Sequence, residues 1–235
     1  MKKILFLLLI SHTLFSATPQ EIESYLSISK KDREIIQIEQ VFDSMRASED
    51  NSTQEINQIY SLYLEEHLSS DELQTILVLY RTPIMQRYVI ETDTGELPAQ
   101  EMKEFLQTLK ETPLTTERLD IVENILKHTL DEKQMLAFYN SMTQRYQLSK
   151  NKDTNRTKKE LAFVEMMKSD AKNRLLYGTQ VLEIEEMREL DNALQSSIIS
   201  KVSKVQSDAM IYVMDTFIKN IVAKPLKNNE QNSSN

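Results

Sequence analysis

The stretch from Tyr63 to Tyr88 (YLEEHLSSDELQTILVLYRTPIMQRY) constrains the fold most, because it contains the end of one helix, a whole second helix and the start of a third. Ser69 with Glu72 three residues later is a capping box, which marks a helix start. The second helix then carries one apolar face at helical spacing, made by Leu73, Ile76, Leu77 and Tyr80. We therefore expect closely spaced, consecutive helices here.

The third helix of this stretch should begin at a Thr-Pro step. Thr82 is expected to cap it, and Pro83 fits its first position, where a backbone N–H has no helical partner. The same pattern returns 114 positions later, from Tyr177 to Val202. Matching positions hold Tyr63 and Tyr177, Leu68 and Leu182, Glu72-Leu73 and Glu186-Met187, and Thr82-Pro83-Ile84 and Ser196-Ser197-Ile198. The sequence thus predicts a helical hairpin used twice.

The composition favours helices throughout the chain. Only 2 of its 235 residues are glycine, whereas sheets joined by tight turns use more glycine. The predicted fold is all-α, a multi-helix bundle built from two related helical hairpins. Its expected segments are a signal peptide (1–17), an N-terminal helical half with the first hairpin (18–148), a polar linker (149–159), a C-terminal helical half with the second hairpin (160–225) and a disordered tail (226–235).

The first residues have the pattern of a removable signal peptide. Lys2 and Lys3 precede the apolar run Ile4–Ile10, and Ser16 or Ala17 offers a small residue for cleavage. The apolar stretch is shorter than the roughly 20 residues of a spanning helix, and the chain has no cysteine for a lipid anchor. We expect a soluble periplasmic protein exported by a Sec-type signal. An uncleaved, membrane-tethered form is the alternative.

Two further helices are clear from their ends. Thr18-Pro19-Gln20-Glu21 repeats the start signal of a cap, an N-terminal proline and a glutamate. Ser197–Ala223 should form one long helix whose apolar stripe broadens after Ala209 to include Ile211, Tyr212 and Met214. A broad stripe predicts burial on more than one side, near the centre of the bundle. Its charged residues Asp208, Asp215 and Lys219 argue against a membrane span.

The charge balance disfavours two classes of partner. The formal net charge is −8, and it becomes −10 without Lys2 and Lys3. An acidic chain whose longest basic run is Lys158-Lys159 is a poor ligand for phosphate backbones and for anionic membrane surfaces. We therefore expect no nucleic-acid partner and no stable membrane span after cleavage.

Metal and cofactor sites find little support in the residue types. The expected mature chain has only His67 and His128, and no cysteine, so a structural zinc site is not expected. His67 should instead end its helix. Met166-Met167, or Met210 with Met214, could be soft-metal ligands, but methionine at helical spacing usually fills a core or lines an adaptable groove. We predict no cofactor.

Catalytic motifs are similarly scarce. The chain has no G-x-S-x-G elbow, no cysteine nucleophile and no glycine-rich phosphate loop. The acid pairs Glu65-Glu66 and Glu185-Glu186 could serve a carboxylate hydrolase, yet adjacent helical residues point about 100° apart. Solvated helix faces explain these pairs better. No catalytic residue is assigned, and a carboxylate hydrolase stays the third-ranked function.

Three asparagines lie in a sequence context that indicates modification. Asn51, Asn155 and Asn232 each have an acidic residue two positions before and a hydroxyl residue two positions after. This context resembles the acidic, extended acceptor sequence of bacterial asparagine-linked oligosaccharyltransferases. All three fall in segments predicted as loop or tail, where a transferase could reach them. We expect glycans there; the alternative is that these are simply polar loops.

The segment Glu72-Leu73-x-x-Ile76-Leu77-x-x-Tyr80-x-Thr82-Pro83 resembles a family of exported, all-helical bacterial proteins of unknown function, whose motif joins Glu-Leu, a later aromatic residue and a Ser/Thr-Pro step. That family usually has glycine two positions after the proline, where this chain has Met85. The resemblance implies an exported helical protein and assigns no catalytic residue.

Two classes of function follow from these observations. The first is a periplasmic protein-interaction module that holds an envelope protein on an exposed patch. The alternative is a carrier or chaperone-like binder, which should have a cavity lined by methionines and aromatic side chains for an apolar ligand or an unfolded segment.

Overall fold

The computed structural model describes residues 16–33, 35–36, 53–92, 99–147 and 156–223. Within these ranges the chain is helical and contains no β-strand, which confirms the all-α prediction. The helices are α2 (Pro19–Ser29), α4 (Thr53–His67), α5 (Ser70–Tyr80), α6 (Pro83–Thr92), α7 (Ala99–Glu111), α8 (Thr116–Thr129), α9 (Glu132–Gln147), α10 (Arg156–Gly178), α11 (Ile184–Leu194) and α12 (Ser197–Ala223).

The helix starts follow the capping residues. The capping boxes at Thr18 with Glu21 and at Ser69 with Glu72 are both present. At the Thr-Pro step α6 begins at Pro83, as expected. The hydroxyl of Thr82, however, donates to the carbonyl of Leu79 at 2.7 Å, so this side chain satisfies the end of α5. The same carbonyl also accepts from the N–H of Thr82 at 3.1 Å, so both polar groups of Thr82 serve the end of α5.

Glu21 joins the first described helix to α5. Its carboxylate accepts from the hydroxyl of Ser70 at 2.5 Å and from the amide of Gln74 at 2.9 Å, in addition to the N–H of Thr18. These donors, Ser70 first, lower the pKa of Glu21 from 4.5 to about 2. Beside it, the N–H of Ala17 donates to the carbonyl of Leu68 at 3.1 Å. The start of the described chain is therefore fixed to the α4–α5 junction.

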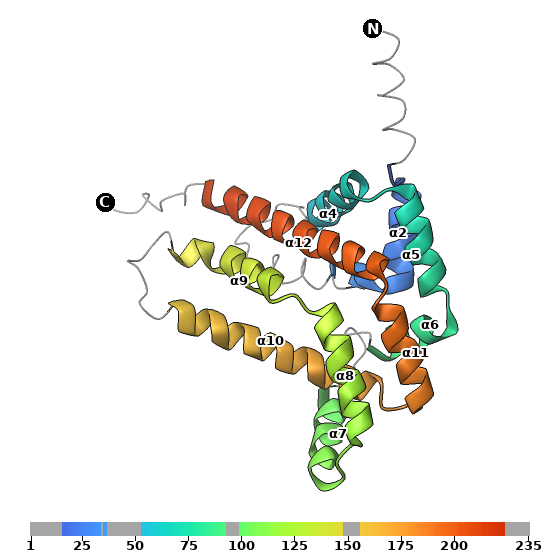
Figure 1. Ribbon diagram of the computed structural model, residues 1–235. Helices are drawn as coiled ribbons and strands as arrows, with labels where there is room; N and C mark the ends of the chain where they lie inside the picture. Colours follow the sequence, from blue (N-terminus) through green and yellow to red (C-terminus); the bar gives the residue numbers. More distant parts are fainter. Residues whose placement is uncertain (1–15, 34, 37–52, 93–98, 148–155, 224–235) are drawn as a thin grey trace, which may run out of the picture.

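The long helix α12 packs against several other helices. It contacts α4, α5, α8 and α9, while α2 packs on α5, α11 packs on α8 and α6, and α10 contacts α6 to α9. Figure 1 shows α12 crossing the molecule, with α9 and α10 on one side of it and α2, α4 and α5 on the other. The expected central position is thus found. Tyr212 is an exception to the broad buried stripe, because its side chain is 52% exposed.

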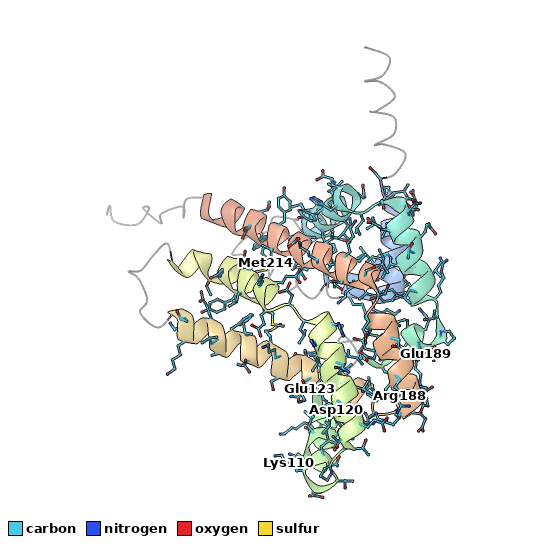
Figure 2. The ribbon with its side chains drawn as sticks, in the orientation of Figure 1. Lys110, Asp120, Glu123, Arg188, Glu189 and Met214 are labelled. Atoms are coloured by element: carbon cyan, nitrogen blue, oxygen red, sulfur yellow. The ribbon has the colours of Figure 1, made fainter. Side chains whose placement is uncertain are left out.

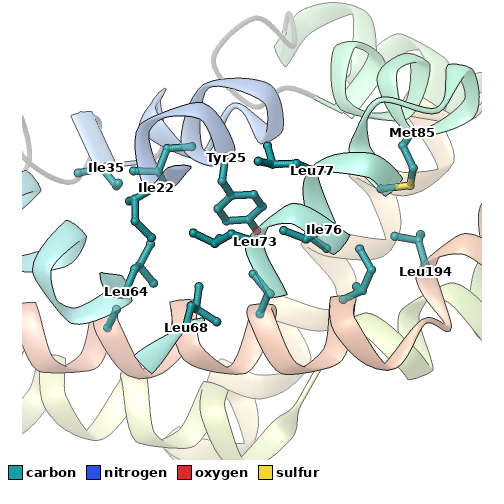
Figure 3. Packing of buried hydrophobic residues seen from close by; sticks show 14 of the residues in the cluster. Ile22, Tyr25, Ile35, Leu64, Leu68, Leu73, Ile76, Leu77, Met85 and Leu194 are labelled. Carbon is teal, nitrogen blue, oxygen red and sulfur yellow. The ribbon is translucent and has the colours of Figure 1, made fainter. Parts of the chain in front are cut away.

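One apolar core joins both halves of the chain. Leu73 and Ile76 of α5 and Leu190 of α11 are fully buried. Leu194 of α11 is only 4% exposed. Figure 3 shows Leu73, Ile76 and Leu77 directed between α2 and α12, near Ile22, Tyr25, Leu64 and Leu68. Met85, at the position where the resembling family has glycine, is fully buried in the same core. The predicted apolar face of α5 is therefore confirmed.

The connection between α10 and α11 is held by two arginines. Arg118 of α8 donates from Nη1 to the carbonyl of Thr179 at 2.9 Å and from Nη2 to that of Leu182 at 2.5 Å. Arg87 of α6 donates to the carbonyl of Val181 at 2.9 Å. These charged donors fix the carbonyl groups of the connection in place, and the carbonyl of Thr179 accepts in addition from the N–H of Leu182 at 3.0 Å.

The last four residues of the predicted linker are helical in the structure. Arg156–Lys159, expected to belong to it, form the first turn of α10. Arginine and lysine are good helix formers, and no glycine or proline interrupts them. The expected leader, positions 149–155 of the linker and the tail lie outside the described residues. Among the described helices, none is long and apolar enough to cross a bilayer.

Candidate functional site

The motif residues predicted from sequence have structural roles. Glu72 accepts from the N–H of Ser69 at 3.0 Å and pairs with Lys201 of α12, while Leu73 is in the core and Pro83 opens α6. Tyr80 makes an edge contact with the buried ring of Tyr25, at 5.8 Å between ring centroids.

The other candidates are not brought together. The glycosylation candidates Asn51, Asn155 and Asn232 lie outside the described residues, so their prediction stays open. His67 ends α4 as expected, with Nδ1 2.7 Å from the carbonyl oxygen of Tyr63. In the described part of the chain no three His, Cys, Asp or Glu side chains are grouped to hold a metal ion. Glu185 and Glu186 are engaged with Arg188 and Arg87 respectively.

A half-open groove of about 540 Å³ lies between α12, α9 and α10 and the ends of the N-terminal helices. Its lining is mainly apolar and includes residues of α4, α5, α6 and α8 as well. Small-molecule sites usually measure about 300–1,000 Å³. The groove is therefore large enough for an organic ligand.

Three methionines on three different helices line the groove. They are Met135 of α9, Met167 of α10 and Met210 of α12. Methionine is flexible and polarizable, so such a wall adapts to ligands of irregular shape. The preceding residue Met166 is 57% exposed and does not line the groove, and Met214 of α12 is buried on the side of α9 (Figure 2).

Aromatic side chains complete the walls. Tyr60, Tyr80 and Tyr88 come from α4, α5 and α6, and Phe138 and Phe163 come from α9 and α10. The two phenylalanine rings stack across α9 and α10, with ring centroids 6.4 Å apart. Rigid rings beside flexible thioethers give the groove both shape and adaptability.

Gln206 is the polar member of the buried stripe of α12, which otherwise consists of Ile199, Val202, Ala209, Val213, Met214 and Phe217. Its side chain lines the groove, yet only 9% of the residue is exposed. The amide nitrogen Nε2 is buried without a hydrogen-bond partner among the described residues. An unpaired buried donor destabilises a protein by roughly 1–3 kcal/mol, so this residue is better suited to binding than to stability.

The charged residues that line the groove are mostly cationic. They are Lys30 and Lys31 at the end of α2, Arg174 of α10 and a single acid, Asp131. Arg174 donates to Asp170 on its own helix at 2.7 Å, and Asp131 accepts from the N–H of Lys133 at 2.8 Å. Three cations and one acid therefore line the groove, in a chain whose net charge is −8.

Two ion pairs cross between the stretches Tyr63–Tyr88 and Tyr177–Val202. Glu72 of α5 pairs with Lys201 of α12, and Glu186 of α11 pairs with Arg87 of α6 at 2.5 Å. Glu186 also accepts from the N–H of Glu183 at 2.8 Å, as Glu72 does from the N–H of Ser69. The two glutamates are 114 positions apart, and so are the two cations. Each stretch thus supplies the counter-charge of the other.

Sequence reasoning missed most of the groove. It identified the methionines as residues that could line an adaptable surface and Tyr80 as part of a motif, but it did not single out Gln206 or Lys30. For Gln206 the sequence did contain a signal, namely a glutamine in an apolar helical stripe.

Comparisons with protein-family models, curated proteins and solved structures find no match to this chain.

Proposed function

We propose that this protein is a non-enzymatic carrier that holds an apolar ligand in the groove between α9, α10 and α12. The observation that carries the proposal is the groove itself, about 540 Å³ and lined by methionine and aromatic side chains. A cavity of this kind was the feature expected of a carrier and not of an interaction module. The carrier is therefore preferred over the module.

The two related stretches provide the frame of this carrier. We treat Tyr63–Tyr88 and Tyr177–Val202 as copies of one helical unit. In support, α5 and α11 both have 11 residues, and the ion pairs of their capping glutamates are reciprocal. Double-mutant cycles should give a similar coupling for both pairs, each below about 1 kcal/mol because the pairs are exposed. Coupling at one pair alone would contradict the relationship.

Delivery to the periplasm remains part of the proposal. It is supported by the charged start, the short apolar run and the small residues near Ser16, and by the resemblance of the Glu72–Pro83 motif to exported helical proteins. The intact mass of the protein from its native host tests this point and the glycans together. A mass equal to that of the bare, full-length polypeptide would exclude cleavage of the leader and attachment of glycans.

A protein-interaction module is the second candidate. Val78 of α5 and Ile90 of α6 are 64% and 63% exposed, which is unusual for large apolar side chains in successive helices. Exposed apolar residues mark interaction sites when they are contiguous. Replacing both by serine should abolish capture of a partner and leave ligand binding in the groove unchanged.

The carrier is tested with the uncharged fluorescent probe N-phenyl-1-naphthylamine, whose emission rises in apolar surroundings. The purified protein should bind it, and Met167→Glu should weaken binding at least tenfold because it places a charge in the groove wall. Met166→Glu is the matched control, since it introduces the same charge one residue earlier at an exposed position. Helicity measured by circular dichroism verifies that both variants are folded. Equal binding by the two variants, or no binding by the native protein, would refute the proposal.

A further inference from the structure

We propose that the ligand of the groove is a single-chain amphiphile with a carboxylate head group, that is, a fatty acid. This inference rests on the proposed carrier function and adds to it the polarity of the ligand. It is drawn from the charge of the lining, from the unpaired amide of Gln206 and from the dimensions of the groove.

The charge of the lining selects an anionic head group. Of the four charged side chains that line the groove, three are cations (Lys30, Lys31 and Arg174) and one, Asp131, is an acid. The chain as a whole has a net charge of −8, so the excess of cations in the lining differs from the overall composition. Opposite charge across an interface contributes mainly to selectivity between ligands, because wrong partners are repelled. A cationic amphiphile should therefore be excluded.

Gln206 selects a ligand that carries a hydrogen-bond acceptor. The last torsion of a glutamine side chain is broad, so its amide can turn to present an N–H to the groove that it lines. A carboxylate oxygen is a strong acceptor for such a donor, whereas a pure hydrocarbon leaves the donor unpaired. The polar residue in the buried stripe of α12 is thereby explained as a recognition residue.

The dimensions of the groove favour one extended chain. Its wall on α12 runs from Ile199 to Ile211, which is about 18 Å at 1.5 Å per residue. Methionines and phenylalanines from α9 and α10 line the facing side. An apolar groove of this length can hold a single acyl chain, and its half-open form leaves room for the head group.

The experiment compares oleate, oleyl alcohol and oleylamine, which share one chain and differ in the head group, as competitors of N-phenyl-1-naphthylamine. Oleate should displace the probe at the lowest concentration, and oleylamine at the highest. Equal competition by oleate and oleyl alcohol would overturn the inference but leave the carrier intact, because the probe still binds. Failure of the probe to bind would instead refute the carrier itself.

Two variants assign the selectivity to its residues. Lys30→Asn with Lys31→Gln should reduce the preference for oleate over oleyl alcohol roughly three- to tenfold, as expected for two partly exposed charges. Asparagine tolerates the left-handed backbone of residue 30, whose φ is 58°. The control is Lys103→Gln with Lys110→Gln, which also removes two positive charges, but at exposed positions of α7. Lys110 lies at the end of α7 that is far from α12 (Figure 2). An equal effect of both double variants would overturn the role of the groove lysines.

Gln206→Leu tests the amide separately. It should weaken oleate binding at least threefold while raising the urea midpoint of unfolding, because it removes an unpaired buried donor. Opposite changes in binding and stability distinguish a recognition residue from a structural one. Unchanged affinity for oleate, or a loss of stability, would refute this assignment.

Discussion

The close approach of α10 to α6 at Gly178 gives the sharpest test of the packing. A Cβ at residue 178 would lie 2.5 Å from Cγ2 of Thr92 and 2.8 Å from the carbonyl oxygen of Glu91. The second neighbour is backbone, so the last turn of α6 would have to move. Gly178→Ala places one methyl group at this contact and is the smallest change that probes it.

Two effects of opposite sign decide the outcome. Gly178 is the last residue of α10 and does not have a positive φ, so helix propensity alone predicts a gain of up to about 1 kcal/mol for alanine. Overpacking of a closed contact destabilises a protein by roughly 1–3 kcal/mol. Because one of the two clashing neighbours is rigid, we expect the second effect to win. Gly178→Ala should lower the free energy of unfolding by about 1–2 kcal/mol.

The assay is urea unfolding followed by far-UV circular dichroism, since the chain has no tryptophan and its described part is helical. Thr92→Ser supplies a matched background. It removes the Cγ2 methyl group but keeps a hydroxyl that can donate to the carbonyl of Tyr88, as Thr92 does at 2.7 Å. In the Thr92→Ser background, Gly178→Ala should lower the free energy of unfolding by about 0.5–1 kcal/mol less than it does in the native protein. A Gly178→Ala protein as stable as the native one would refute the close packing.

Three further changes test the core, a charged contact and a titrating group. Leu73→Ala and Leu190→Ala should each lower the free energy of unfolding by about 2–5 kcal/mol, while Val78→Ala, at a 64% exposed position, should change it by less than about 0.5 kcal/mol; urea titrations that gave all three the same value would contradict the shared core. Arg118→Lys keeps the charge but cannot donate to two carbonyl groups at once, so a loss of roughly 1–3 kcal/mol is expected in the same assay, and an unchanged midpoint would count against the double contact. The pKa of Glu21 is about 2 in the folded protein and 4.5 ordinarily, so its stabilisation is present above about pH 4.5 and is lost as the pH falls toward 2. Glu21→Gln should therefore lose about 1 kcal/mol at neutral pH, allowing for solvent screening, and should show a shallower decline in stability on acidification; parallel pH profiles would disprove this.

Local signals made most helices predictable. Ser69 and Glu72 lie three residues apart, and the free backbone groups that they satisfy belong to the same turn, so no distant contact is needed to place the start of α5. The same holds for α12, whose predicted range, Ser197–Ala223, is the one found. Thr82 was harder, because its hydroxyl has two helix ends within reach and the sequence does not say which one it serves.

Contacts between distant residues could not be predicted in this way. Arg118 reaches carbonyl groups more than 60 positions away, and the groove forms where α12 meets helices from every part of the chain. Helical periodicity tells which side of α12 is apolar but not what faces it. Gln206 is visible in the sequence as a polar residue in an apolar stripe, but the lack of a partner for its amide is known only from the packed structure. Tyr212 shows the converse, since it extended the apolar stripe in sequence but lies in a half-exposed position.

The crossed ion pairs also bear on the order in which the chain can become stable. Glu72 and Arg87 are synthesised more than 90 residues before the cation and the carboxylate that neutralise them. The same delay applies to the apolar surfaces of α4, α5 and α9, because the helix that covers them is the last of the described helices to leave the ribosome. Contacts between residues so far apart in the sequence slow folding and prolong the exposure of apolar surface. A nascent chain of this protein should therefore need protection from aggregation until α12 has been made, and truncation before Ser197 should yield an insoluble product.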